Sequence, residues 1–386
     1  MPVAAMREAL SAFFGEVYGR RPAAMARAPG RVEFIGNHTD YNGGAVMGAA
    51  IDRSVWVAVA AREDDRRRFL SGRGGTVVEQ RGPRRPVTGE GAWVNYPTGV
   101  GAALAHFGLD CPGGFDLAVM ADLPVGAGLS SSAAIELATA LALLELTGAS
   151  LERQRLVELA RWAENEFVGM PCGILDQGVS GFGRRGRLVW IDCHGPRFAT
   201  VPLPASLRLV VFNTATQHAL IEGLYAERHR ECMTAAAALG VSALATATLG
   251  DLEAAKPGLT PGGYDRARHV IEEHARVMAA RSALERGDFG SVGALLTASH
   301  RSSQKWFQNS TAELDFLVDA LTACPGVLGA RLTGGGFGGA VMALVDESYA
   351  SATGVEVQEA YARKFGLRPE ILELKTADGA EVVKPD

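Results

Sequence analysis

The chain has 386 residues, of which 47% are hydrophobic and 21% charged, a composition typical of globular proteins and long enough for two domains. Its formal net charge of −5 gives no general attraction to nucleic acid or anionic membranes, so neither is expected as a partner. Five widely spread cysteines favour free thiols in a reducing cytoplasm, and no apolar run reaches membrane-spanning length.

The N-terminal segment is predicted to form an amphipathic helix over residues 6–18, which is unlike a signal peptide, and a strand near 25–29. The stretch 30–44 then places an arginine, a histidine, an aspartate and two asparagines among four glycines. Such a stretch either binds a ligand or forms a polar turn in which Asp40 and Asn42 make local bonds. The residues alone leave both interpretations open.

Alternating residues predict strands over 46–61 and, with a Gly-Gly turn, over 69–80, and a helix is predicted over 93–107. This helix carries three residues that either wall a pocket for a nucleotide base or belong to the core: Trp93, Tyr96 and Gly99.

The stretch 124–134 reads PVGAGLSSSAA, between a strand predicted over 115–120 and a helix predicted from Ser130 to about Leu146. A glycine-rich approach to a helix N-terminus points backbone N–H groups and the positive end of the helix dipole at an anion. Phosphate binding is therefore predicted, the alternative being an ordinary serine-capped helix. The first lysine of the chain is Lys256, which excludes a Walker A loop and argues against a protein-kinase fold.

A further helix is predicted over 151–167, capped by Ser150, with Glu164 near its end. Asp176 follows after a turn that contains glycine and proline. Two such acids can converge, one holding a metal and the other accepting a proton. The alternatives are an exposed helix acid and a helix N-cap, and Cys172 between them is interpreted as a buried thiol.

In the second half, strands are predicted over 189–191, 207–212 and 340–345, and helices over 223–239, 265–286 and 288–302. A domain junction is expected near Gly195. Residues 334–339 place five glycines around Phe337, which allows close approach of the backbone to a ligand or forms a tight hairpin.

With these segments in this order, the chain resembles the GHMP kinase superfamily and, within it, the galactokinase family. Residues 30–44 are similar to the galactokinase signature, 124–134 to the phosphate-loop motif and 333–339 to the third motif. The resemblance covers nearly the whole chain. It implies an α+β fold of two domains, 1–195 and 196–386, with the active site in the cleft between them.

The resemblance also implies roles by position. Asp176 matches the catalytic aspartate that accepts the proton of the anomeric hydroxyl, and Arg31 matches the arginine that stabilises the alkoxide and the phosphates. Ser132 and Glu164 match the Mg²⁺ ligands. The implied sugar contacts are Asn37, His38, Asp40, Gly173 and Tyr225. The implied cradle of the nucleotide phosphates is Gly126, Ala127, Gly128, Leu129, Ser130, Ser131 and Ser132.

The implied activity is Mg²⁺- and ATP-dependent phosphorylation of the anomeric hydroxyl of a hexose, with conversion of α-D-galactose to galactose 1-phosphate as the first interpretation. The alternatives are a 1-kinase for galacturonate or N-acetylgalactosamine, and a non-catalytic sugar sensor. The intact serines, Arg31 and Asp176 argue against the sensor. The expected location is cytoplasmic; the oligomeric state is left open, and a monomer is compatible with the sequence.

Two departures from the family pattern bear on the sugar. Asn37 stands where the family has a glutamate that takes the sugar's primary hydroxyl, and residues 304–309 replace a stretch that is usually acidic. Both remove negative charge. One hypothesis is that the protein tolerates changes at C6, a carboxylate included; the alternative is that other groups restore the contact and galactose stays preferred.

Overall fold

The computed structural model describes residues 3–124, 128–216 and 221–385, without the side chains of 221 and 222. The helices are α1 Val3–Tyr18, α2 Asn95–His106, α3 Ser131–Thr147, α4 Arg153–Trp162, α5 Leu175–Phe182, α6 Ile221–Leu239, α7 Leu249–Ala255, α8 Pro261–Arg286, α9 Phe289–Ser302, α10 Ala312–Thr322 and α11 Ser351–Phe365. The strands are β1 Ala24–Ile35, β2 Ala45–Arg62, β3 Arg67–Ser71, β4 Val78–Gln80, β5 Gly114–Ala121, β6 Arg187–Asp192, β7 Arg197–Pro202, β8 Arg208–Asn213, β9 Val327–Thr333, β10 Ala340–Val345, β11 Glu370–Leu374 and β12 Glu381–Val383. Short 3₁₀ or π-helical turns are Asp40–Asn42, Gly89–Val94, Ala163–Val168, Leu244–Thr246, Lys256–Gly258 and Ser303–Phe307.

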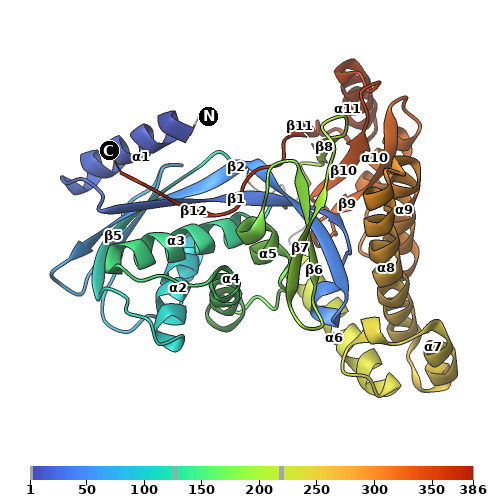
Figure 1. The fold of residues 1–386 in the computed structure, drawn as a ribbon, viewed down its shortest axis with the longest axis horizontal. Coiled ribbons are helices and arrows are strands. Elements are labelled where there is room, and N and C mark those ends of the chain that lie inside the picture. The colour runs from blue at the N-terminus through green and yellow to red at the C-terminus, as the bar shows by residue number, and fades with distance from the viewer. Residues whose placement is uncertain (1–2, 125–127, 217–220, 386) are drawn as a thin grey trace.

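The first sheet is built on the long antiparallel pair β1 and β2, in the order β12-β1-β2-β5-β3-β4, and β6 joins β2 to β7. Helices α2, α3 and α4 lie on one side of this sheet, and α1 lies on the other (Figure 1). Because helices cover both faces, β1 and β2 are almost continuously buried instead of alternating. Packing on both faces therefore fixes the position of β1, the strand that carries Arg31 and Glu33.

The second sheet is antiparallel, in the order β11-β8-β10-β9. Helices α9 and α10 pack against β9, and α8 packs along α9 (Figure 1). Strands β9 and β10 form a hairpin whose connection, residues 334–339, is bonded to Asn37 and His38, just after the end of β1. In this connection the backbone is left-handed at Phe337 and at four of the glycines, a conformation that glycine adopts without a steric penalty.

Two local predictions are wrong, and strand β7 is among the elements that were missed. The signature stretch does not begin as a loop, because β1 continues to Ile35 and pairs with β2 beyond two bulges. Helix α4 begins at Arg153 with Glu152, not Ser150, at its N-cap. β7 was missed because its exposed residues give no apolar pattern.

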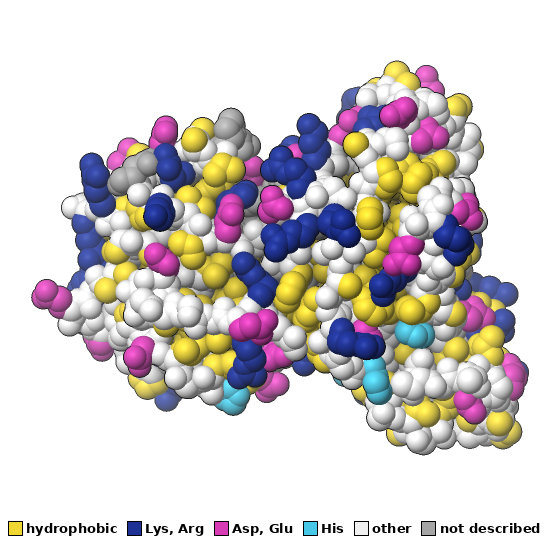
Figure 2. Space-filling view, viewed as in Figure 1, with side chains coloured by type: hydrophobic (Ala, Val, Ile, Leu, Met, Phe, Trp, Pro, Cys, Tyr) yellow, Lys and Arg dark blue, Asp and Glu magenta, His cyan; other side chains and the backbone are white. Residues whose placement is uncertain are grey.

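The division at residues 1–195 and 196–386 stays a prediction. Strands β7 and β12 lie beyond residue 195, yet they pair within the first sheet. The space-filling view shows the two halves meeting at a narrower waist, with basic and acidic side chains interspersed over both (Figure 2). Among the described residues, no helix combines the length and the apolar character needed to cross a membrane.

Candidate active site

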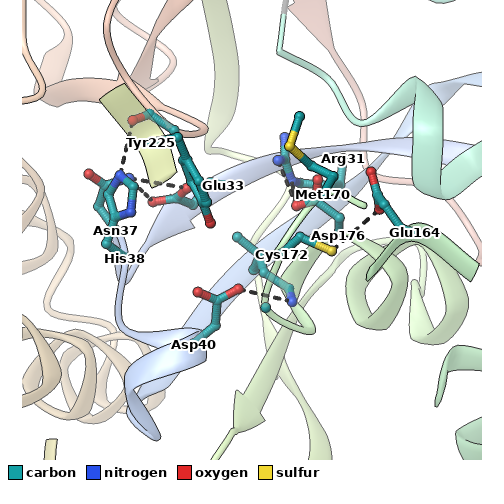
Figure 3. Close-up of a pocket in the computed structure, with 13 residues that line it drawn as sticks. Arg31, Glu33, Asn37, His38, Asp40, Glu164, Met170, Cys172, Asp176 and Tyr225 are labelled. Atoms are coloured by element: carbon teal, nitrogen blue, oxygen red, sulfur yellow. Dashed lines mark hydrogen bonds and ion pairs between the residues drawn. The ribbon is translucent and has the colours of Figure 1, made fainter. Parts of the chain in front are cut away.

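A cavity of about 210 Å³ lies where β1 and α5 meet the glycine-rich connection and α6. It is lined by Arg31, Glu33, Asn37, His38, Asp40, Glu164, Met170, Cys172, Gly173, Leu175, Asp176, Tyr225 and Gly335. Figure 3 shows that the labelled side chains surround one space although they come from distant parts of the chain. Both predicted catalytic residues and all the predicted sugar contacts line this cavity.

The centre of the cavity is an ion pair between Arg31 and Asp176. Arg31 Nε and Nη2 lie 2.8 and 2.6 Å from Asp176 Oδ1, and Arg31 Nη1 donates to the carbonyl of Gly128 at 2.6 Å. Ser130 Oγ donates to the other oxygen, Asp176 Oδ2, at 2.5 Å. A carboxylate oxygen accepts more than one hydrogen bond, so Oδ2 keeps acceptor capacity toward the cavity, where Asp176 is 25% exposed.

The phosphate-loop segment leads into α3. Gly126 and Ala127 lie outside the described residues; Gly128 has a left-handed backbone, and Leu129 is buried. Ser130 precedes the helix with a left-handed backbone, and its side chain makes no capping bond to the helix. The simple serine-cap alternative is therefore wrong, because this hydroxyl goes to Asp176. Ser131 and Ser132 begin the helix, where backbone N–H groups have no intrahelical partner.

Ser132 and Glu164 lie close together, since the Ser132 hydroxyl is near enough to lower the pKa of the Glu164 carboxyl. Glu164 sits on the π-helical turn that continues α4, where Gln177 Nε2 donates to its Oε2 at 2.5 Å. Burial, with repulsion from Asp176, raises the pKa of Glu164. An adjacent cation would relieve that cost. Within the described ranges, no cluster of three or more His, Cys, Asp or Glu side chains suits a metal, so a carboxylate and a hydroxyl are what this position offers.

Cys172 lies close to this pair. Its thiol is 3.5 Å from Glu164 Oε2 and 3.0 Å from Asn165 Oδ1. Burial and the neighbouring carboxylates raise the pKa of Cys172 well above its usual value, so the thiol stays protonated. This agrees with its interpretation as an unreactive thiol, although it also lines the cavity.

A second cavity, of about 200 Å³, opens beside the start of α3. Trp93 and Tyr96 line it together with Ser131 and Ser132, so these two aromatic residues form a pocket wall. Gly99 instead packs against Phe167, where a Cβ atom would lie 3.1 Å from the ring. Trp93 and Tyr96 thus line a cavity and also pack against the core, whereas Gly99 belongs to the packed interior.

The side chain of Asp40 packs directly against the backbone of Gly173. Asp40 accepts the backbone N–H of Tyr41 at 2.9 Å and that of Leu175 at 3.4 Å. A Cβ atom on Gly173 would lie 1.9 Å from Asp40 Oδ2, so only glycine fits there. Burial, with repulsion from nearby carboxylates, raises the pKa of Asp40 to about 6.

His38 is a structural part of the cavity wall. Its ring stacks on Phe307 with centroids 4.2 Å apart, and burial lowers its pKa to about 3. A neutral ring has one donor: Nε2 donates to the carbonyl of Gly335 at 3.0 Å, and Nδ1 accepts from Tyr41 at 2.8 Å. Tyr225, from α6, lies beside this ring with centroids 5.1 Å apart.

Two residues that line the cavities were missed by sequence reasoning. Glu33 is a carboxylate on β1, and its place on the same face as Arg31 is the signal that was available, since residues two apart on a strand share a face. Arg73 lines the second cavity and donates to the carbonyl of Leu123. The sequence around Arg73 is typical of a surface segment, so no pattern there predicted that this residue would line a cavity.

Comparisons with known proteins identify the class of protein to which the chain belongs. Models of the GHMP kinase N-terminal and C-terminal domains match residues 95–184 and 280–363. The fold extends to a mevalonate kinase from Methanococcus jannaschii, with a TM-score of 0.64 over 92% of this chain and 98% of that one, at 18% identity. The class of protein is thus a GHMP kinase.

A narrower family is also defined. A galactokinase galactose-binding signature matches residues 12–61. Galactokinases from Homo sapiens and Chloroflexus aurantiacus are 37% and 38% identical over 96% and 97% of this chain, and over 95% and 97% of their own lengths. The structure of Lactococcus lactis galactokinase complexed with galactose superposes with a TM-score of 0.92 at 31% identity, over 97% of this chain and 99% of that one. The chain belongs to the galactokinase family.

Proposed function

We propose that this protein transfers the γ-phosphoryl group of ATP to the anomeric hydroxyl of α-D-galactose, giving galactose 1-phosphate and ADP. The observation that carries the proposal is the Arg31–Asp176 pair, which lies between the cavity and the phosphate loop and bonds to Gly128 and Ser130 of that loop. A base beside a sugar-sized cavity and next to a phosphate site is what direct phosphoryl transfer needs.

Asp176 is the proposed proton acceptor. Asp176 lines the cavity, Ser130 is the one donor to its Oδ2 among the described residues, and the paired Arg31 keeps the carboxylate oriented. As the anomeric hydroxyl loses its proton to Oδ2, its oxygen attacks the γ-phosphorus while the bond to the bridging oxygen of ADP breaks. Arg31 is fixed by three short contacts and offers positive charge to the developing alkoxide and phosphate oxygens without rearranging.

Mg²⁺ is the proposed cofactor. The adjacent hydroxyl of Ser132 and carboxylate of Glu164 fit a hard cation that prefers oxygen ligands and that nucleotide phosphates complete. When bound, the ion would neutralise phosphate charge, a role that fits the lack of a lysine in the phosphate loop. Gln177 holds the Glu164 carboxylate in place.

The nucleotide is proposed to bind along the start of α3. The phosphates would meet the backbone and hydroxyls of residues 126–132, and the base would enter the second cavity between Trp93 and Tyr96. The sugar would occupy the first cavity. There Asp40 and Tyr225 offer polar groups, whereas Gly173 leaves room, and His38 and Asn37 shape the wall. The cysteines among the described residues are free, which supports a reducing, cytoplasmic location.

The test is sugar-dependent release of ADP by the purified protein with Mg²⁺-ATP. The panel contains galactose, glucose, galacturonate and N-acetylgalactosamine, each with and without excess chelator. Galactose is expected to have the highest kcat/KM, and the chelator is expected to abolish turnover. No ADP release with any sugar, in a protein that still binds galactose, would replace this proposal with the sensor.

A further inference from the structure

The side chain of Asn37 is used up by contacts within the protein. Its Nδ2 donates to the carbonyl of Gly334 at 2.8 Å and to Glu33 Oε1 at 3.2 Å. Its Oδ1 accepts from Asn309 Nδ2 at 2.7 Å and from Ser303 Oγ at 3.3 Å. A primary amide has two donor hydrogens and two acceptor positions, so this one has none left for a sugar. Asn37 therefore lines the cavity without an unused polar group.

The neighbouring carboxylate of Glu33 has the opposite character. Its Oε1 accepts from Arg331 Nη2 at 2.9 Å and from Asn37 at 3.2 Å. Among the described residues, its Oε2 has only a 3.5 Å contact with Asn37 Nδ2, too long for a good hydrogen bond. Glu33 lines the cavity, and Figure 3 shows it beside Asn37 and Tyr225. One oxygen of a well-anchored carboxylate is thus available at the sugar site.

The position of Glu33 along β1 fixes which part of a sugar it meets. Arg31 and Glu33 are two residues apart in a regularly paired stretch of the strand, so they share a face and lie about 6.6 Å apart along it. Arg31 holds the base Asp176. A pyranose whose anomeric hydroxyl is at Asp176 therefore directs its far side toward Glu33.

We propose that the carboxylate of Glu33, and not the residue at position 37, determines sugar specificity. Its Oε2 accepts a hydrogen bond from a hydroxyl on the side of the ring away from the anomeric carbon. Asn37 is a positioning residue that orients this carboxylate. The inference rests on the proposed function and names the chemistry of its substrate.

The charge of this acid has a consequence for the substrate. Burial raises the pKa of Glu33 above its usual value, but Arg331 is fully buried behind it, and their ion pair acts against that rise and favours the ionised carboxylate. A carboxylate accepts a hydroxyl proton but repels a second carboxylate at close range. The site is therefore built for a neutral sugar, and galacturonate is excluded although position 37 carries no charge. This reverses the hypothesis that the loss of a glutamate at position 37 opens the site to C6 acids.

The experiment combines Glu33→Gln with a series of deoxygalactoses that each lack one hydroxyl. The variant keeps the shape of the side chain but removes its charge, and it is expected to lower kcat/KM for galactose by about tenfold to a hundredfold. For the deoxysugar that lacks the partner hydroxyl, wild type and variant are expected to become nearly equal. The ratio of galacturonate to galactose activity is expected to rise, with KM for ATP unchanged.

Glu273→Gln is the matched control. Glu273 is another fully buried acid behind the same loop, paired with Arg276 and bonded to the N–H groups of Gly36 and Asn37. It is not part of the cavity wall, so its loss is expected to act equally on all sugars. If Glu33→Gln also lowers all sugars by the same factor, Glu33 merely supports Arg331 and the proposal is overturned.

Asn37→Glu gives an independent test that does not depend on the folding of the first variant. It places a second carboxylate about 3 Å from Glu33, and like charges at that distance repel. The proposal expects kcat/KM for galactose to fall. A rise would assign sugar recognition to position 37 and refute the role of Glu33. If the wild-type protein releases no ADP with any sugar, the proposed function fails instead, which is a different result.

Discussion

Replacing the proposed base is the most direct test of the catalytic geometry. In Asp176→Asn, the amide oxygen can still accept from Arg31, and the amide nitrogen can donate to Ser130, whose hydroxyl then turns to accept. The ion pair with Arg31 becomes a hydrogen bond from a charged guanidinium to a neutral amide oxygen, a loss of about 1–2 kcal/mol in the free energy of unfolding. The amide cannot take the proton of the sugar, so kcat is expected to fall by about 10²–10⁴.

The assay is single-turnover ADP formation at saturating galactose and Mg²⁺-ATP, with nucleotide affinity measured separately. Asp192→Asn is a suitable control, because Asp192 is also paired with an arginine and has a similar exposure, 19% against 25% for Asp176, but lies outside the cavity. The control is expected to keep its kcat. A value of kcat in Asp176→Asn within about tenfold of wild type would refute general-base catalysis and leave Asp176 with an orienting role only.

The pKa of about 6 at Asp40, raised first by burial, means that this acid is protonated below pH 6 and cannot then accept as a carboxylate; kcat/KM for galactose is expected to rise with pH up to about 6, and this rise should be absent in Asp40→Asn. Gly173→Ala places a Cβ atom 1.9 Å from the Asp40 carboxylate, so KM for the sugar should increase while KM for ATP stays constant. Trp93→Ala removes a stacking surface and should raise KM for ATP alone by about tenfold, unless the base binds elsewhere. Glu164→Gln offers Mg²⁺ a neutral oxygen and should raise the half-saturating Mg²⁺ concentration by about tenfold; an unchanged titration curve would remove Glu164 from the metal site.

Local sequence signals determined much of the framework. Helix α3 ends at the predicted Gly148, where the backbone is left-handed, because a C-terminal glycine acts through its own conformational freedom. Strands β5 and β10 were also predicted from local signals, because a run of apolar residues becomes buried in a sheet whichever strands are its neighbours. The family resemblance located Arg31 and Asp176, which the structure joins in one ion pair.

Local sequence patterns could not predict which groups the polar side chains would contact. Ser130 resembled a helix cap in the sequence, but its hydroxyl bonds to Asp176, which is 46 positions away. Glu33 was not singled out in the sequence, because nothing near it in the chain predicts its pairing with Arg331 on β9. Such pairings depend on which strands become neighbours, and that is settled by packing of the whole chain.

The sequence by itself determined the family, and it predicted the phosphate loop and most of the residues that line the cavities, but not Glu33 or Arg73. Only the tertiary structure decided which polar atoms remain unused once the chain has folded. At Asn37 the donors and acceptors are consumed by Gly334, Asn309, Ser303 and Glu33, all brought there by folding. A residue type states how many hydrogen bonds a side chain can make, whereas three-dimensional contacts determine how many are left for a substrate.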